Sequence, residues 1–156
     1  IADHRDELLR TIREWDFLLI NDGEARMLSG ERNLRKAADK IRALGPKTLI
    51  IKRGEYGAML FQKDGYFVVP GYLLEQVFDP TGAGDSFAAG MLGYLSSLGG
   101  GLDFESVKMG LACGSVTASF AVSGFGVTGL RDLGREAIAE RLKQYLATNQ
   151  LQGVRQ

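Results

Sequence analysis

The sequence has few of the side chains on which most reactive sites depend. Its 156 residues include one cysteine, Cys113, and one histidine, His4. A single histidine excludes His-based metal clusters and a Ser-His-Asp relay, and we expect His4 to be an exposed helix residue. A single cysteine excludes an internal disulfide, a zinc ribbon and a Cys-x-x-Cys redox motif.

The sequence also lacks a net charge, a long apolar run and a Walker A phosphate loop. Nineteen Lys and Arg balance 19 Asp and Glu, which argues against nucleic acid or a membrane surface as a partner. No run of 18 apolar residues occurs, and the first residues are too charged for a signal peptide. Together with the lone cysteine, these features predict a cytoplasmic protein. No Gly-Lys-Ser or Gly-Lys-Thr occurs in the sequence.

Glycine, in contrast, is abundant, with 21 residues against only three prolines. A hydrophobic fraction of 45% is enough for a packed core, so disorder is excluded. Short apolar runs at residues 17–20 and 48–51 predict buried strands, and the segments before and between them have helical spacing. Strands separated by helices predict an α/β fold with a parallel sheet.

The middle of the chain adds an antiparallel hairpin to that prediction. Residues 58–62 and 66–69 are strand-like and are divided by Asp64-Gly65, a strong hairpin signal. A further extended stretch is expected at residues 72–78, and helices are expected from Ser86, from Asp103 and around Ile138 to Leu146. We expect one domain over residues 1–150 and a frayed tail at 151–156.

The segment from Thr81 to Phe87 has the pattern of an anion site. Gly82 and Gly84 precede a predicted helix, so their N–H groups are unobstructed at its positive end. The carboxylate of Asp85 would repel a phosphate there unless it accepts a proton during the reaction. Phosphoryl transfer to a hydroxyl group needs both hydrogen-bond donors for the transferred phosphoryl group and a base for the attacking hydroxyl group. Two alternatives stay open: an ordinary helix start whose dipole Asp85 complements, and a Rossmann loop, which would lack its third glycine.

Three segments of the sequence resemble the ribokinase-like (PfkB) carbohydrate and nucleoside kinases. The segment from Asp79 to Phe87, Asp-Pro-Thr-Gly-Ala-Gly-Asp-Ser-Phe, resembles the second signature of that family. Asn21 and Glu24 match its Asn-x-x-Glu motif, and residues 52–58 stand where members carry a turn beside the ATP phosphates. The resemblance implies a three-layer, Rossmann-like α/β fold with helices on both faces of a largely parallel sheet and an antiparallel edge hairpin.

The resemblance also implies roles for individual residues. Asp85 would be the general base, and the backbone N–H groups of Gly82, Ala83 and Gly84 would form the anion hole. Asn21 and Glu24 would hold Mg²⁺ through water; the alternative for this pair is an N-cap with a first-turn acid. The remaining implied positions are nucleotide contacts at Lys52, Gly54, Gly57, Cys113 and Gly124 and potassium ligands at Asp79 and Thr81. Lys52 is also explained as a solvated charge at a strand end.

We therefore expect an ATP-dependent kinase that uses Mg²⁺ and phosphorylates a hydroxyl group of a sugar or nucleoside, with K⁺ as a further cofactor that the resemblance allows. Family members are about twice as long, and this chain corresponds to their C-terminal half, so we expect it to be inactive by itself. The resemblance is also compatible with a homodimer of the full-length protein. The alternative is a noncatalytic nucleotide-binding or regulatory module with the same fold.

Overall fold

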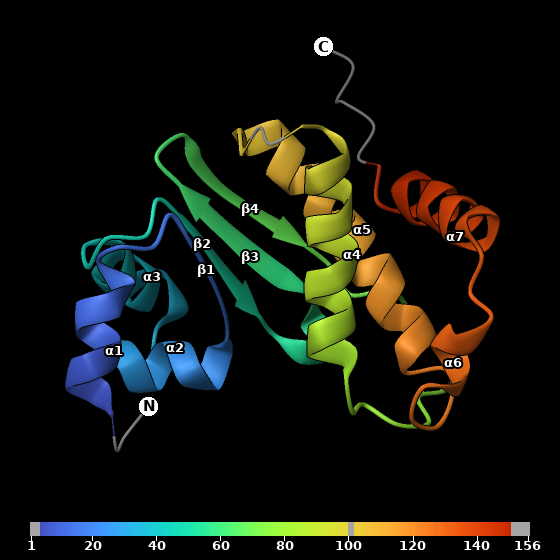
Figure 1. Ribbon diagram of the computed structural model, residues 1–156, viewed down its shortest axis with the longest axis horizontal. Helices are drawn as coiled ribbons and strands as arrows, with labels where there is room; N and C mark the ends of the chain where they lie inside the picture. The colour runs from blue at the N-terminus through green and yellow to red at the C-terminus, as the bar shows by residue number, and fades with distance from the viewer. Residues whose placement is uncertain (1–3, 100–101, 151–156) are drawn as a thin grey trace, which may run out of the picture. The chain divides into compact units, whose positions relative to one another are not determined.

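Residues 4–99 and 102–150 are described by a computed structural model, drawn in Figure 1. The chain divides into two units, Ile1–Gly71 and Tyr72–Gln156, and each is described by itself. The single domain expected over residues 1–150 stays a prediction. The predicted frayed tail lies outside the described residues.

The first unit contains a four-stranded mixed sheet with the strand order β1-β2-β3-β4. β1 and β2 are parallel, and β3 and β4 each run antiparallel to the preceding strand. Both the parallel pair and the hairpin at Asp64-Gly65 were predicted from the sequence, and the structure confirms them. The elements are α1 (Arg5–Ile12), β1 (Phe17–Asn21), α2 (Asp22–Ser29), α3 (Leu34–Arg42), β2 (Thr48–Lys52), the 3₁₀ turn η1 (Gly54–Tyr56), β3 (Ala58–Gln62) and β4 (Gly65–Val69).

Helices α1, α2 and α3 lie on the same side of this sheet (Figure 1). Their apolar faces pack against the strand residues that point toward them, since alternate residues of a strand face opposite sides of a sheet. The resulting core contains Ile12, Leu18, Ala25, Leu28, Ala38, Ile41, Leu49, Ile51 and Phe61. This core fixes β1 and β2 side by side, so that their carboxyl ends are neighbours.

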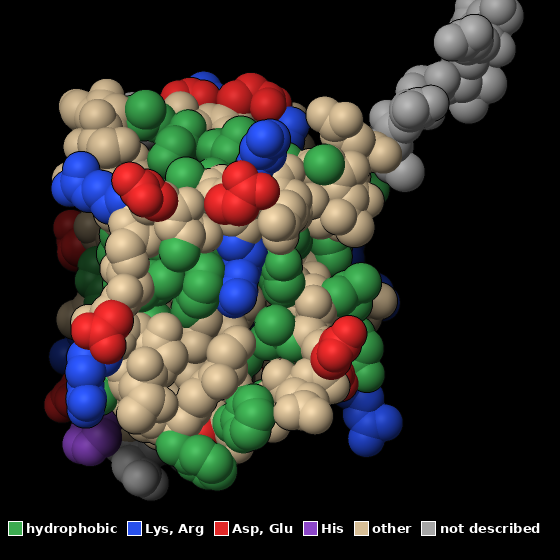
Figure 2. All heavy atoms as spheres, turned by 90° about the vertical axis from the view of Figure 1, so that its right-hand side faces the viewer, with side chains coloured by type: hydrophobic (Ala, Val, Ile, Leu, Met, Phe, Trp, Pro, Cys, Tyr) green, Lys and Arg blue, Asp and Glu red, His purple; other side chains and the backbone are tan. Residues whose placement is uncertain are grey.

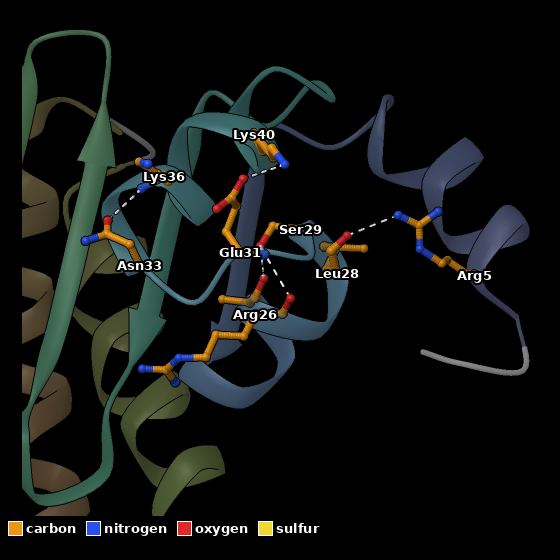
Figure 3. Close-up of polar contacts among 9 residues, drawn as sticks. Arg5, Arg26, Leu28, Ser29, Glu31, Asn33, Lys36 and Lys40 are labelled. Carbon is orange, nitrogen blue, oxygen red and sulfur yellow. Dashed lines mark hydrogen bonds and ion pairs between the residues drawn. The ribbon is translucent and has the colours of Figure 1, made fainter.

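Polar contacts join α1 to α2 and α3 to the segment that precedes it (Figure 3). The guanidinium of Arg5 on α1 donates to the carbonyl of Leu28 near the end of α2, at 3.2 Å. The ammonium of Lys40 on α3 lies 2.6 Å from the carboxylate of Glu31, which precedes that helix, and lowers the pKa of Glu31. These contacts are only partly buried, so the apolar core contributes most of the stability.

The second unit is helical, and its elements are α4 (Ala83–Ser97), α5 (Phe104–Ala121), α6 (Thr128–Arg131) and α7 (Arg135–Thr148). Helix α4 begins three residues before the predicted start at Ser86, because the backbone turns at Gly82 and continues directly as a helix. Residues 72–78, expected to be extended, form no strand. The short helix α6 was not predicted. The predicted start of a helix at Asp103 is confirmed, and Asp103 caps α5 by accepting the N–H of Ser106 at 3.0 Å.

Helices α4 and α5 lie side by side because small residues face each other along their contact (Figure 1). A Cβ atom at Gly90 would lie 2.3 Å from the hydroxyl oxygen of Thr117 and 2.9 Å from the carbonyl oxygen of Cys113. A Cβ at Gly114 would lie 2.8 Å from the carbonyl oxygen of Phe87. The backbones therefore approach too closely for any larger residue at Gly90 or Gly114.

Gly90 and Gly93, which are on the same helix, give a matched test of this packing. We expect Gly90→Ala to lower the free energy of unfolding by about 1–3 kcal/mol, because its methyl group overpacks the contact with α5. Gly93 is exposed, and a Cβ there meets no atom of the unit, so Gly93→Ala should raise that free energy by about 0.5–1 kcal/mol. Urea denaturation of the two variants measures both values. Equal effects would contradict the close contact at Gly90.

Candidate active site

The turn before α4 has a backbone conformation that requires glycine. Gly82 has φ +78° and ψ −2°, and the N–H of Ala83 donates to the carbonyl of Pro80 at 3.2 Å. These values match a type II β-turn with Gly82 in its third position. The turn makes Gly82 the N-cap of α4, so the helix starts without a side-chain cap.

The absence of a side-chain cap leaves hydrogen-bond donors available at the positive end of α4. The N–H groups of Gly82, Gly84 and Asp85 have no hydrogen-bond partner among residues 4–99 and 102–150. The N–H of Ala83, the other predicted anion-hole donor, is engaged in the turn at 3.2 Å. An anion placed at this end of the helix would meet free donors and a favourable helix dipole.

Asp85 is the third residue of α4, and its side chain is exposed. Its carboxylate has no hydrogen-bond or ion-pair partner among the described residues. Asp103, at the start of α5, instead caps its own helix by accepting the N–H of Ser106. Asp85 is therefore available to accept a proton from a bound molecule, a role that Asp103 cannot take without losing its cap.

Asp79 connects the turn to a distant segment, a contact that the sequence did not reveal. One carboxylate oxygen accepts the N–H of Thr81 at 2.9 Å, and the other accepts the N–H of Gly126 at 3.3 Å. These hydrogen bonds, that of Thr81 first, hold the pKa of Asp79 below its usual range. Gly126 has φ +57°, and the Gly-Phe-Gly sequence around it was the only available signal of a turn there.

Asn21 and Glu24 form a capping box at the start of α2. The side-chain oxygen of Asn21 accepts the N–H of Glu24 at 2.8 Å, and the N–H of Asn21 donates to the Oε2 atom of Glu24 at 2.8 Å. The capping alternative therefore describes what these residues do in the structure. It leaves Oε1 of Glu24 and the amide nitrogen of Asn21 without a partner among the described residues.

Lys52 and Asn21 are paired in register at the carboxyl ends of β2 and β1. Ligands of α/β proteins commonly bind at this edge of a parallel sheet. Gly54, in the turn after Lys52, has φ +58° and open space around it. At Gly57 the requirement for glycine is explained by packing, because a Cβ there would lie 2.0 Å from the carbonyl oxygen of Val69. The structure thus brings Asn21, Glu24 and Lys52 together.

Cys113 and Gly124 lie in the second unit, on α5 and just after it. The Cys113 thiol is buried, and burial raises its pKa to about 11. At Gly124 a Cβ would lie 2.6 Å from the hydroxyl oxygen of Thr128, so this glycine allows the chain to turn closely into α6. The small size of Gly124 is thus explained by packing, and the predicted contact of Cys113 and Gly124 with a nucleotide stays a prediction.

The raised pKa of Cys113 predicts a slow reaction with thiol reagents. A pKa two units above the usual value lowers the thiolate fraction at pH 8 about 100-fold, and burial slows access further. We expect iodoacetamide to label Cys113 at least about 100-fold more slowly in the folded protein than in urea. Peptide mass spectrometry separates Cys113 from any other cysteine of a longer protein. Similar rates in the two states would contradict a buried thiol.

The described residues were also compared with the requirements of a metal site and of a membrane span. Figure 2 shows acidic and basic side chains mixed with hydrophobic ones on the face that it draws. Within the described ranges, no group of three or more His, Cys, Asp and Glu residues could hold a metal ion. No helix in the part of the chain that the structure describes has the length and apolar character needed to cross a membrane.

Comparison with known proteins identifies the family to which these features belong. The profile of the pfkB family carbohydrate kinases matches residues 1–130. The chain belongs to this family. The match includes both the capping box of α2 and the turn before α4, so the resemblance stated from the sequence motifs is confirmed.

Several relatives are kinases of nucleosides. The chain is 37% identical over 111 residues to a cytidine kinase of Thermococcus kodakarensis, covering 69% of this chain and 38% of the relative. It is 35% identical over 122 residues to a nucleoside kinase of Methanocaldococcus jannaschii, covering 78% of this chain and 37% of the relative. The chain thus spans less than half the length of the relatives it matches.

Solved structures confirm the α/β, ribokinase-like fold. Aminoimidazole riboside kinase from Salmonella enterica, in complex with aminoimidazole riboside and an ATP analog, matches with a TM-score of 0.81 and 27% identity. The match covers 91% of this chain and 47% of that one. A fructokinase from Vibrio cholerae matches with the same TM-score at 20% identity, which is a likeness of fold alone.

Proposed function

We propose that the full-length protein containing this chain transfers the γ-phosphoryl group of ATP to a hydroxyl group of a sugar or nucleoside. Family membership supports the reaction class, and the named relatives favour a nucleoside or a related riboside as the acceptor. The observation that carries the proposal is the exposed carboxylate of Asp85, which lies in the first turn of α4 with the N–H groups of Gly82 and Gly84; none of these groups has a partner among residues 4–99 and 102–150.

Asp85 acts as the general base. Its carboxylate takes the proton of the acceptor hydroxyl as the acceptor oxygen forms a bond to the γ-phosphorus and the bond to the leaving ADP breaks. Because Asp85 caps no helix, accepting the proton breaks no hydrogen bond within the described residues.

The N–H groups of Gly82 and Gly84 stabilise the negative charge on the transferred group. They are held by the turn before the reaction starts, so little reorganisation is needed in the transition state. The N–H of Ala83, which contacts Pro80 at 3.2 Å, adds to this set only as a shared donor. A larger residue at Gly82 would strain the turn, because φ +78° is unfavourable for side chains other than glycine.

Asn21 and Glu24 hold Mg²⁺ through water molecules. Mg²⁺ retains several waters in most sites and takes oxygen ligands, which fits a single carboxylate with one oxygen unpartnered. When bound with ATP, Mg²⁺ neutralises part of the charge on the phosphates. Glu24 contributes negative charge, and Asn21 keeps that carboxylate in place through its backbone N–H.

Lys52 and Gly54 contact the nucleotide phosphates. Lys52 supplies a positive charge at the end of β2, and Gly54 leaves the backbone open to a close approach. The neighbouring Arg53 supports this assignment, because its buried Nε atom has no hydrogen-bond partner among the described residues. A phosphate oxygen would satisfy that donor.

The remaining assignments follow from the family resemblance. Asp79 and Thr81 are candidate K⁺ ligands, and the hydrogen bonds from Thr81 and Gly126 lower the pKa of the Asp79 carboxyl group. Gly57, Cys113 and Gly124 lie on elements that contact the nucleotide in this proposal. A cytoplasmic location and a homodimer of the full-length protein remain part of the proposal.

Replacement of Asp85 tests the catalytic base. Asp85→Asn keeps the shape of the side chain and removes its ability to accept a proton, so the rate of the chemical step should fall about 10²–10⁴-fold. ATP affinity should stay level or increase, because a negative charge near the phosphates is removed. Single-turnover phosphoryl transfer and an ATP-binding titration on the full-length protein measure the two effects.

Glu136→Gln provides the matched control, because Glu136 is an exposed acid in the first turn of α7. Its loss should cost at most about 1 kcal/mol of stability through the helix dipole and leave turnover unchanged. Near-normal turnover in Asp85→Asn would remove the base assignment and favour the noncatalytic nucleotide-binding module.

Replacement of Glu24 tests the magnesium assignment. In Glu24→Gln the side-chain oxygen still accepts the N–H of Asn21, so the capping box and the stability should be largely retained. The lost charge should raise the Mg²⁺ concentration for half-maximal rate about tenfold or more. Loss of a residue that holds a metal through one of its ligands typically lowers the metal affinity by this factor. A rate titration with Mg²⁺ on the full-length protein measures this concentration.

Asn21→Ala and Asn33→Ala separate capping from metal binding. Both asparagines accept the N–H of the third helical residue, Asn21 for α2 and Asn33 for α3. Each replacement should therefore cost about 1 kcal/mol of stability. Only Asn21→Ala should also change the Mg²⁺ requirement. An unchanged requirement in both Asn21→Ala and Glu24→Gln would reduce the pair to a helix cap.

A further inference from the structure

The segment before α4 is fastened to the segment after α5. The N–H of Phe78 donates to the carbonyl of Val122 at 2.9 Å. The ring of Phe78 meets the ring of Phe125 edge to face, with centroids 6.1 Å apart. Asp79 adds a third link through the N–H of Gly126. These three contacts join positions more than 40 residues apart in the sequence.

Asp79 differs from the other two links because it also contacts the turn itself. Its Oδ1 atom accepts the N–H of Thr81, the second residue of the turn, and its Oδ2 atom accepts the N–H of Gly126. One half-buried carboxylate thus holds both segments at once. Hydrogen bonds to an ionised acceptor are stronger than those to a neutral one.

The orientation of the turn determines where the donors at the start of α4 point. Thr81 and Gly82 are the central residues of the turn, and α4 follows without an intervening loop. A rotation of Thr81 would therefore move the N–H groups of Gly82 and Gly84 together with the carboxylate of Asp85. Misplacement of reacting groups by about 1 Å can cost about 10²-fold in rate.

We propose that Asp79 is a positioning residue for phosphoryl transfer, which fixes the turn before α4 by binding Thr81 and Gly126 simultaneously. This role rests on the proposed function. It differs from K⁺ ligation because it depends on two backbone donors that are present in the chain itself.

Asp79→Asn is the direct test, on the full-length protein. Asparagine keeps one acceptor oxygen but presents an NH₂ donor to the other N–H, so one of the two links is lost. We expect faster amide exchange in residues 122–127 or in the turn, a fall in kcat of at least about tenfold, and a change in the KM for ATP below about threefold. Exchange is read by peptide mass spectrometry and needs no activity.

Asp103→Asn is the matched control, because Asp103 also accepts a backbone N–H and has a lowered pKa, but serves only α5. It should leave kcat and exchange in residues 122–127 unchanged. Gly126→Ala tests the link from its other end, since φ +57° disfavours alanine although the space is open. Gly134→Ala, at a negative φ with open space, is its control. Only Gly126→Ala should lower kcat.

Three outcomes would overturn the positioning role while the proposed function stands. These are unchanged exchange in Asp79→Asn, unchanged kcat in both Asp79→Asn and Gly126→Ala, and recovery of Asp79→Asn by added KCl, which would make Asp79 a cation ligand. An inactive wild-type protein would overturn the proposed function itself, and the positioning role with it.

Discussion

The close contact between α4 and α5 is the constraint on which the candidate active site depends. Gly90 and Gly114 let the two backbones approach until no Cβ atom fits between them. Contact at this distance leaves little freedom for α4 to slide or rotate, because protein interiors are closely packed. The α4–α5 contact therefore fixes the body of α4, and the hydrogen bonds of Asp79 fix the turn that leads into its first residues.

The described helices differ in whether a side chain caps their first N–H groups. Asn21, Asn33 and Asp103 use side-chain oxygens to cap α2, α3 and α5. Helix α4 begins at Gly82, which has no side chain to offer, and keeps its donors free. A capped helix gains stability, whereas an uncapped one keeps hydrogen-bonding capacity for a ligand. Helices α1, α6 and α7 also begin without a side-chain cap, so α4 is considered the start of an anion site because its free donors adjoin Asp85, whose carboxylate has no partner among the described residues.

The sequence predicted those features that depend on local patterns. The four strands, the hairpin at Asp64-Gly65 and the start of a helix at Asp103 all follow from short-range signals that the structure confirms. The link between Asp79 and Gly126 could not be predicted in this way, because its partners are 47 positions apart and each has a plausible local role. The sequence predicts the start of α4 at Ser86, three residues too late, because glycines are typical of loops. In the structure Gly82 leads directly into the helix.

The capping box of α2 has a consequence for side-chain entropy. The N–H of Asn21 holds one oxygen of Glu24, so the carboxylate already occupies a single rotamer in the protein without ligands. Immobilising a free glutamate side chain costs up to about 2 kcal/mol. For Glu24 much of this cost is met during folding, when α2 forms. A cation that binds the second oxygen would therefore find an ordered ligand, and its affinity would be higher by the part of the entropy already lost.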